Sequence, residues 1–185
     1  EKDLHFDKPQ PSFALLRSMR PHQWLKNALL FLPLLLSHRV QETDLLFAAF
    51  VGFAAFSLCA SSVYLLNDML DLESDRLHAT KKTRPFAAGE LSLRSGFLLA
   101  PALLVAAFCC AALLNAEFLL TLAGYWLATL CYSLRLKSLL FIDALTLACL
   151  FCARILAGAA AIEVTATTWL LSFALLLFFG LALAK

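Results

Sequence analysis

The sequence has few charged residues and few residues that break helices. Charged residues make up 15% of the 185 residues, and glycine and proline contribute six each. A soluble domain averages about 25% charged residues, so this composition argues against a soluble enzyme. The net charge of +2 is too small to indicate nucleic acid binding. The sequence also lacks a nucleophile elbow, a P-loop and a dinucleotide-binding fingerprint, and the polar stretch 1–20 does not have the pattern of a signal peptide.

Apolar residues dominate instead. They form 62% of the chain, and the mean hydropathy is +0.81, which indicates an integral membrane protein. A membrane-spanning helix needs about 20 apolar residues. We therefore predict an all-α polytopic transmembrane helical bundle of about six spans over residues 21–185, preceded by a cytoplasmic or interfacial lead-in at 1–20. The predicted spans are residues 22–38, with a kink at Pro33, then 45–66, 95–114, 117–134, 139–162 and 168–184.

The basic residues are concentrated in alternate connections. The lead-in through Lys26 and the loop 76–94 hold five each, whereas the turns near 115–117 and 163–167 hold none. Lysine and arginine accumulate on the cytoplasmic side of membrane proteins. We therefore expect the protein to lie in a bacterial inner (plasma) membrane, with the N-terminus and the loop 76–94 on the cytoplasmic side.

An acidic motif ends the second predicted span. If the chain stays helical there, Asp68, Asp71 and Asp75 lie at i, i+3 and i+7 and share one face, next to Asn67. Carboxylates packed so closely repel one another unless a cation lies between them. Hard oxygen donors suit Mg²⁺ or Mn²⁺ and not zinc. We predict a Mg²⁺ site at Asp68, Asp71 and Asp75. The alternative is a polar helix end followed by a loop that only fixes the topology.

Basic side chains follow this motif closely. Lys82 and Arg84 lie in the next loop and have the chemistry to bind phosphate groups. Magnesium in proteins typically takes one or two carboxylates together with substrate phosphates. The two clusters together predict a phosphorylated substrate held at the cytoplasmic end of the second span.

Two ionisable residues, Asp143 and Arg154, lie inside the fifth predicted span. Such a residue costs at least about 2.5 kcal/mol in the membrane, so it is a functional candidate by default. The two are about 16 Å apart along a straight helix and cannot pair with each other. We expect Asp143 near the Asp68 motif. Arg154 has either a functional role or a structural bond to backbone carbonyls of a neighbouring helix, and Gly158 with its alanine neighbours is expected to form a close-packing face.

Three stretches of the sequence together resemble a known family. The run Asn67-Asp68-x-x-Asp71-x-x-x-Asp75, continued by Arg84-Pro85, is similar to the first aspartate-rich motif of UbiA-type intramembrane prenyltransferases. The stretch from Arg20 to Asn27 and the run from Tyr132 to Gly158 are most similar to the branch that contains decaprenyl-phosphate phosphoribosyltransferase. The resemblance implies a bundle of about nine spans around a central cavity that opens to cytoplasm and lipid.

The resemblance also implies roles for individual residues. It makes Asp68, Asp71 and Asp143 the catalytic candidates, and it places Asn67 with the Mg²⁺ cofactor and the donor diphosphate. The remaining substrate-binding candidates are Lys26, Lys82, Arg84, Tyr132 and Lys137. The implied reaction is phosphoribosyl transfer from phosphoribosyl pyrophosphate to a polyprenyl phosphate, or prenyl transfer to an acceptor. The implied partners are the lipid bilayer, an isoprenoid lipid and a phosphorylated donor.

The length leaves two expectations open. Members of the family have a second polar motif and three further spans beyond the position of Lys185. The chain is therefore expected to be either part of a complete transferase or a truncated, non-catalytic membrane subunit. The second would bind an isoprenoid, a quinone or a pigment, or pack into a larger membrane complex.

Overall fold

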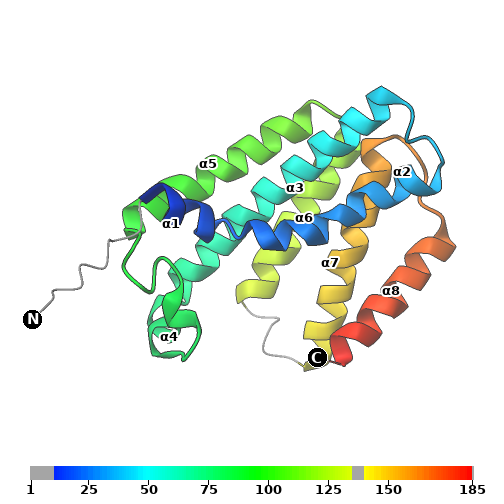
Figure 1. The fold of residues 1–185 in the computed structure, drawn as a ribbon. Coiled ribbons are helices and arrows are strands. Elements are labelled where there is room, and N and C mark those ends of the chain that lie inside the picture. The colour runs from blue at the N-terminus through cyan, green and yellow to red at the C-terminus, as the bar shows by residue number, and fades with distance from the viewer. Residues whose placement is uncertain (1–10, 135–139, 185) are drawn as a thin grey trace, which may run out of the picture.

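The structure is a computed structural model that describes residues 11–134 and 140–184. These residues form helices and connections only, as predicted (Figure 1). In chain order the helices are α1 (Pro11–Ser18), the 3₁₀ helix η1 (Pro21–Phe31), α2 (Leu32–Leu36), α3 (Thr43–Leu70), α4 (Leu72–Leu77), the 3₁₀ turn η2 (Lys81–Thr83), α5 (Leu93–Ala112), α6 (Ala116–Leu134), α7 (Leu140–Ala161) and α8 (Thr168–Leu183).

Four of these helices, α3, α5, α6 and α7, are long and apolar enough to cross a membrane. They correspond to the second to fifth predicted spans. Large apolar side chains on the outside, such as Phe47, Phe97 and Trp169, are more than half exposed. A soluble protein does not leave so much apolar surface in water. The fold is therefore a polytopic transmembrane helical bundle.

The first predicted span has a different form from the expected one. The chain forms the 3₁₀ helix η1, which passes directly into α2 at Leu32, so Pro33 falls in the first turn of α2. Proline is tolerated in a first turn because its missing N–H would have no partner there. A 3₁₀ helix rises about 2.0 Å per residue. Because of this longer rise, η1 and α2 together extend about 30 Å, which matches the hydrocarbon thickness of a bilayer.

The connections gather at two ends of the bundle. Those from α2 to α3, from α5 to α6 and from α7 to α8 lie at one end, and α4 lies at the other (Figure 1). The helix η1 crosses α7 closely: a Cβ on Gly158 would clash with the carbonyl oxygen of Leu30. Gly158 therefore belongs to a close-packing face, as predicted, and this contact fixes η1 against α7.

Candidate functional site

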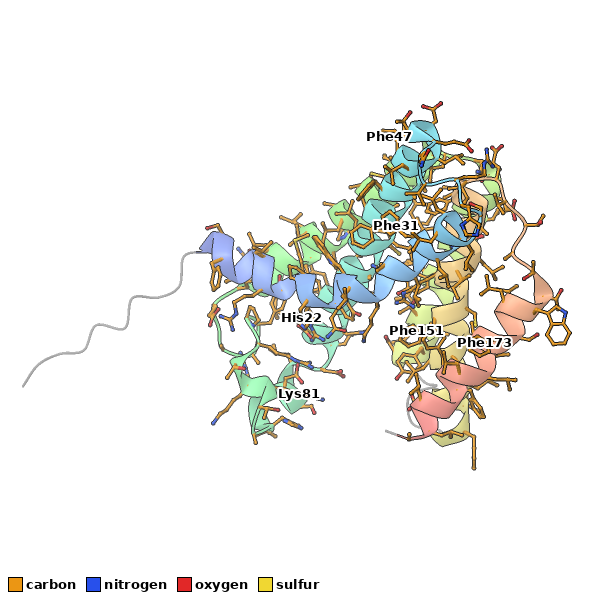
Figure 2. The ribbon with its side chains drawn as sticks, turned by 45° about the vertical axis from the view of Figure 1, so that its right-hand side comes forward. His22, Phe31, Phe47, Lys81, Phe151 and Phe173 are labelled. Carbon is orange, nitrogen blue, oxygen red and sulfur yellow. The ribbon has the colours of Figure 1, made fainter. Side chains whose placement is uncertain are left out.

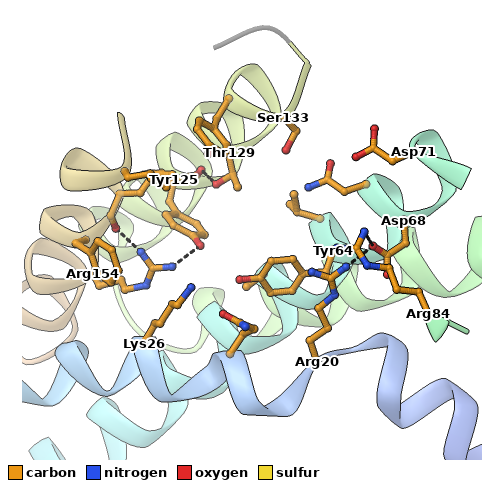
Figure 3. A pocket seen from close by; sticks show the side chains of 18 of the residues that line it. Arg20, Lys26, Tyr64, Asp68, Asp71, Arg84, Tyr125, Thr129, Ser133 and Arg154 are labelled. Atoms are coloured by element: carbon orange, nitrogen blue, oxygen red, sulfur yellow. Dashed lines mark hydrogen bonds and ion pairs between the residues drawn. The ribbon is translucent and has the colours of Figure 1, made fainter. Parts of the chain in front are cut away.

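A cavity of about 460 Å³ opens between η1, α3, α6 and α7, near the end of the bundle that carries α4 (Figure 3). Polar side chains from all four helices and from the connection after α4 line it. They are Arg20, Gln23, Lys26, Tyr64, Asn67, Asp68, Asp71, Lys81, Arg84, Tyr125, Thr129, Tyr132, Ser133 and Arg154. Such a polar cavity inside an apolar bundle is the default position of a functional site.

Asp68 is the centre of the charged end of this cavity. Its side chain is 1% exposed, and its Oδ1 accepts hydrogen bonds from Arg20 Nη2 and, at 3.2 Å, from Arg84 Nη1. Arg20 has a left-handed backbone conformation, with φ of 52°, where the chain turns from α1 into η1. That turn brings its guanidinium over the Tyr64 ring, 5.1 Å from the centroid, and onto Asp68.

Asp75 lies behind Arg84 and does not line the cavity. Arg84 Nη1 donates to Asp75 Oδ2 at 2.6 Å, and the Asp75 side chain is 2% exposed. The helix is interrupted at Asp71, yet Asp71 N bonds to Asn67 O and Asp75 N bonds to Asp71 O. These bonds preserve the helical path, so Asp68 and Asp75 lie on the same helix face, as their i, i+7 spacing predicts. Both carboxylates bind the same side chain, Arg84.

Asn67 and Asp71 line the cavity beside Asp68. Within residues 11–134 and 140–184, however, no three acidic, histidine or cysteine side chains lie close enough together to bind one metal ion. In place of a cation between three carboxylates, the guanidinium of Arg84 bridges Asp68 and Asp75. The predicted Mg²⁺ ligands Asp68, Asp71 and Asp75 therefore stay a prediction.

The basic loop presents a different lysine from the predicted one. Both lysines are exposed, but only Lys81 lines the cavity. Neighbouring residues of a 3₁₀ turn point about 120° apart, so η2 cannot direct both lysines to the same side. Lys81 also lines a second, adjoining hollow with His22, and Figure 2 shows these two side chains on the facing sides of η1 and the loop after α4.

Tyr132 and Asp143 meet at the ends of α6 and α7. The Tyr132 hydroxyl lines the cavity region and donates to Asp143 Oδ1 at 2.7 Å. Asp143 is half-buried and lies behind Tyr132, outside the cavity lining. The predicted residue Lys137 lies outside the described residues. Of the remaining predicted substrate-binding residues, Lys26 reaches the cavity from η1 (Figure 3).

Four further residues line the cavity that were not among the predicted site residues: Arg20, Tyr64, Tyr125 and Thr129. Within an apolar span, polar residues that recur at helical spacing indicate a cavity. Tyr125, Thr129 and Tyr132 lie at i, i+4 and i+7, and Tyr64 lies four residues before Asp68. This periodicity was available in the sequence. The position of Arg20 was not, because only the turn before η1 brings it to Asp68.

The profile of the UbiA prenyltransferase family matches residues 28–185, which is most of the chain. The chain belongs to the UbiA prenyltransferase family. The uncharacterized protein y4nM of Sinorhizobium fredii is 39% identical over 184 residues, which are 100% of this chain and 36% of that protein. A decaprenyl-phosphate phosphoribosyltransferase of Mycolicibacterium smegmatis is 34% identical over 171 residues, 90% of this chain and 53% of that enzyme.

A solved structure shows the same fold. A UbiA homolog from Archaeoglobus fulgidus, bound to DMAPP and Mg²⁺, superposes with a TM-score of 0.75 at 22% identity. The match covers 90% of this chain and 60% of that one. The chain thus spans between 36% and 60% of the length of these three proteins.

Proposed function

We propose that the chain is the part of an intramembrane transferase that holds a diphosphate donor, and that the reaction is phosphoribosyl transfer from phosphoribosyl pyrophosphate to a polyprenyl phosphate. One observation carries the proposal: Asp68 and Asp71 line the same cavity as five cationic side chains, which are Arg20, Lys26, Lys81, Arg84 and Arg154. The similarity to decaprenyl-phosphate phosphoribosyltransferases favours this donor and this acceptor.

The residues present fit a magnesium ion. Asp68 Oδ2 and Asp75 Oδ1 are buried oxygens that accept no hydrogen bond from the described residues. A buried acceptor without a partner costs free energy, so a cation or bound water that reaches it is favoured. Asn67, Asp68 and Asp71 would hold the ion, with Asp75 behind them. Bound magnesium would neutralise charge on the donor diphosphate, and the Archaeoglobus homolog binds Mg²⁺ together with a prenyl diphosphate.

The chain's own residues supply charge and position. In the proposed reaction, the bond between C1 of ribose and the diphosphate oxygen breaks, and an oxygen of the acceptor phosphate forms the new bond to C1. Lys81, Arg20 and Arg84 would stabilise the departing diphosphate, because donors fixed before the reaction need no rearrangement as charge develops. The cavity walls would exclude water and align the two substrates. By the distribution of basic residues, this end of the bundle lies on the cytoplasmic side of a bacterial inner membrane.

The test is Mg²⁺-dependent binding of phosphoribosyl pyrophosphate to the protein in detergent or nanodiscs, by titration calorimetry. Asp68→Asn should weaken binding about tenfold or more, since a charged group contributes about that much. Glu42→Gln is the matched control, because it neutralises a carboxylate of the connection before α3, away from the cavity lining. Equal binding by the parent and Asp68→Asn would remove the site assignment.

A second candidate is prenyl transfer, which the DMAPP- and GPP-bound homologs favour. The same titration with dimethylallyl diphosphate distinguishes the two. Tighter Mg²⁺-dependent binding of the prenyl diphosphate than of phosphoribosyl pyrophosphate would replace the proposed donor. Binding of neither diphosphate, together with binding of an isoprenoid or quinone, would support a non-catalytic membrane subunit.

A further inference from the structure

Arg154 is a buried cation whose charge no described carboxylate balances. It is 5% exposed and lies within α7. Its Nε donates to Asn27 Oδ1 at 2.9 Å, its Nη1 to Leu150 O at 2.5 Å and its Nη2 to the Tyr125 hydroxyl at 2.9 Å. All three acceptors are neutral, and within residues 11–134 and 140–184 no ion pair includes Arg154. A buried charge without a counter-charge is costly, so its retention calls for an anion.

The surrounding network fixes the direction of this guanidinium. Asn27 Nδ2 donates to Ser57 Oγ at 3.1 Å, so the bonds join η1, α3, α6 and α7. The rings of Tyr125 and Phe151 lie 5.0 and 5.3 Å from the guanidinium carbon. A guanidinium has five N–H donors, and the described residues accept three hydrogen bonds from it. The side chain lines the cavity, where a ligand can accept the others (Figure 3).

The two ends of the cavity differ in kind. Around Asp68 lie carboxylates and several cations, which suit a metal-bound diphosphate. The apolar residues of the cavity lining come from two spans, α3 and α7, and two of them, Leu150 and Phe151, lie against Arg154. The residues are Ala60, Val63, Leu147, Leu150 and Phe151. Arg154, with Lys26 of η1 beside it (Figure 3), and this apolar wall suit an amphiphile that has an anionic head and a hydrocarbon tail.

We infer that Arg154 binds the phosphate of the isoprenoid acceptor, and that Tyr125 and Asn27 hold the guanidinium in place for it. The inference rests on the proposed function, in which donor and acceptor share the cavity. It assigns them to different ends: the donor diphosphate to the Asp68 end and the acceptor phosphomonoester to the Arg154 end. Selectivity for an isoprenoid phosphate over the corresponding alcohol then depends on Arg154, with Lys26 on the same side of the cavity.

The test compares binding of geranyl phosphate and of geraniol to the protein in nanodiscs. The parent should prefer the phosphate, and Arg154→Gln should reduce that preference about tenfold or more, because the loss includes a charge-assisted hydrogen bond. Arg154→Lys should recover part of it. Ser62→Ala is the control, since the buried Ser62 hydroxyl of α3 donates to Ala100 O, outside this network, and Ser62 does not line the cavity. It should keep the preference. An unchanged preference in Arg154→Gln overturns the inference.

A second measurement does not depend on the folding of Arg154→Gln. Binding of geranyl phosphate should survive both the removal of Mg²⁺ and Asp68→Asn, because the phosphate is assigned to the other end of the cavity. Loss of binding in either case would place the phosphate at the Asp68 end and overturn the inference. Failure of the proposed function appears separately, as a loss of Mg²⁺-dependent phosphoribosyl pyrophosphate binding with the geranyl phosphate preference intact.

Discussion

Two arginine–carboxylate pairs of the same length lie in opposite surroundings. Arg84 Nη1 is 2.6 Å from Asp75 Oδ2 beside the cavity, and Arg39 Nε is 2.6 Å from Glu42 Oε1 in the connection before α3. The Arg84 and Asp75 side chains are 26% and 2% exposed, whereas those of Arg39 and Glu42 are 45% and 49% exposed. Water screens the second pair and has little access to the first.

The difference teaches that contact distance alone does not indicate what an ion pair does. A buried ion pair adds little to the stability of the folded state, because the free-energy cost of removing two charges from water is about as large as their attraction. Its presence at the cavity therefore needs another reason, and the fixed charge of the proposed diphosphate site supplies one. The exposed pair needs no such reason.

The largest effect is expected from Arg84→Met. It leaves Asp75 buried without its hydrogen bond and removes one of two arginines from Asp68, which should cost about 3–5 kcal/mol in free energy of unfolding. Unfolding in mixed micelles measures this. The control is Arg39→Met, which removes the arginine of the exposed pair with Glu42. An equal loss in both variants would contradict the distinction between buried and exposed pairs.

Asp75→Asn should have the next largest effect on stability and little effect on the binding of the donor. The amide keeps the shape of the side chain but places a neutral group beside Arg84, at a cost of about 1–3 kcal/mol. Because Asp75 does not line the cavity, phosphoribosyl pyrophosphate binding should fall much less than in Asp68→Asn. Binding lost to the same extent in both variants would make Asp75 a ligand in its own right.

Tyr132→Phe tests a half-buried carboxylate, that of Asp143, which lies between the buried and the exposed pair in accessibility. It removes the hydroxyl that donates to Asp143, and the loss should be about 1 kcal/mol because water can reach the half-buried carboxylate. Tyr64→Phe serves as control, since no described carboxylate accepts a hydrogen bond from the Tyr64 hydroxyl. A loss as large as that of Arg84→Met would show that Asp143 is more enclosed than its exposure indicates.

The smallest effect is expected at the exposed pair, and it should depend on pH. The hydrogen bond from Arg39 lowers the pKa of Glu42 from its ordinary value of 4.5. A lowered pKa stabilises the folded state above pH 4.5, and this contribution is lost as the pH falls through the folded value. The difference in melting temperature between the parent and Glu42→Gln should therefore shrink between about pH 7 and about pH 3, and also in high salt. A difference that stays constant would refute the pairing.

Local sequence predicted most of the fold. The apolar run 45–66 is continuous, and the structure forms α3 there, extended to Leu70 because helical hydrogen bonds continue through Asn67 and Asp71. The prediction was wrong in form for the first span. An apolar run with a proline indicates membrane burial, but it does not distinguish a kinked α-helix from a 3₁₀ helix followed by a new α-helix.

The candidate site was predictable only in part. The spacing of Asp68 and Asp75 placed them on one face, and they share that face in the structure. The register could not show that Arg84 would bridge them, nor that Lys81 instead of Lys82 would reach the cavity. Those outcomes depend on how the loop after α4 folds back on α3.

The sequence by itself determined that this protein is a helical membrane bundle with acids at the end of a span, because burial in lipid and helical period are properties of neighbouring residues. Only the tertiary structure decided which charges meet. Arg20 and Asp68 are 48 positions apart, and Arg154 and Asn27 are 127 apart. Contacts over such separations depend on how helices pack, and side-chain patterns along one helix carry no information about its partner's register.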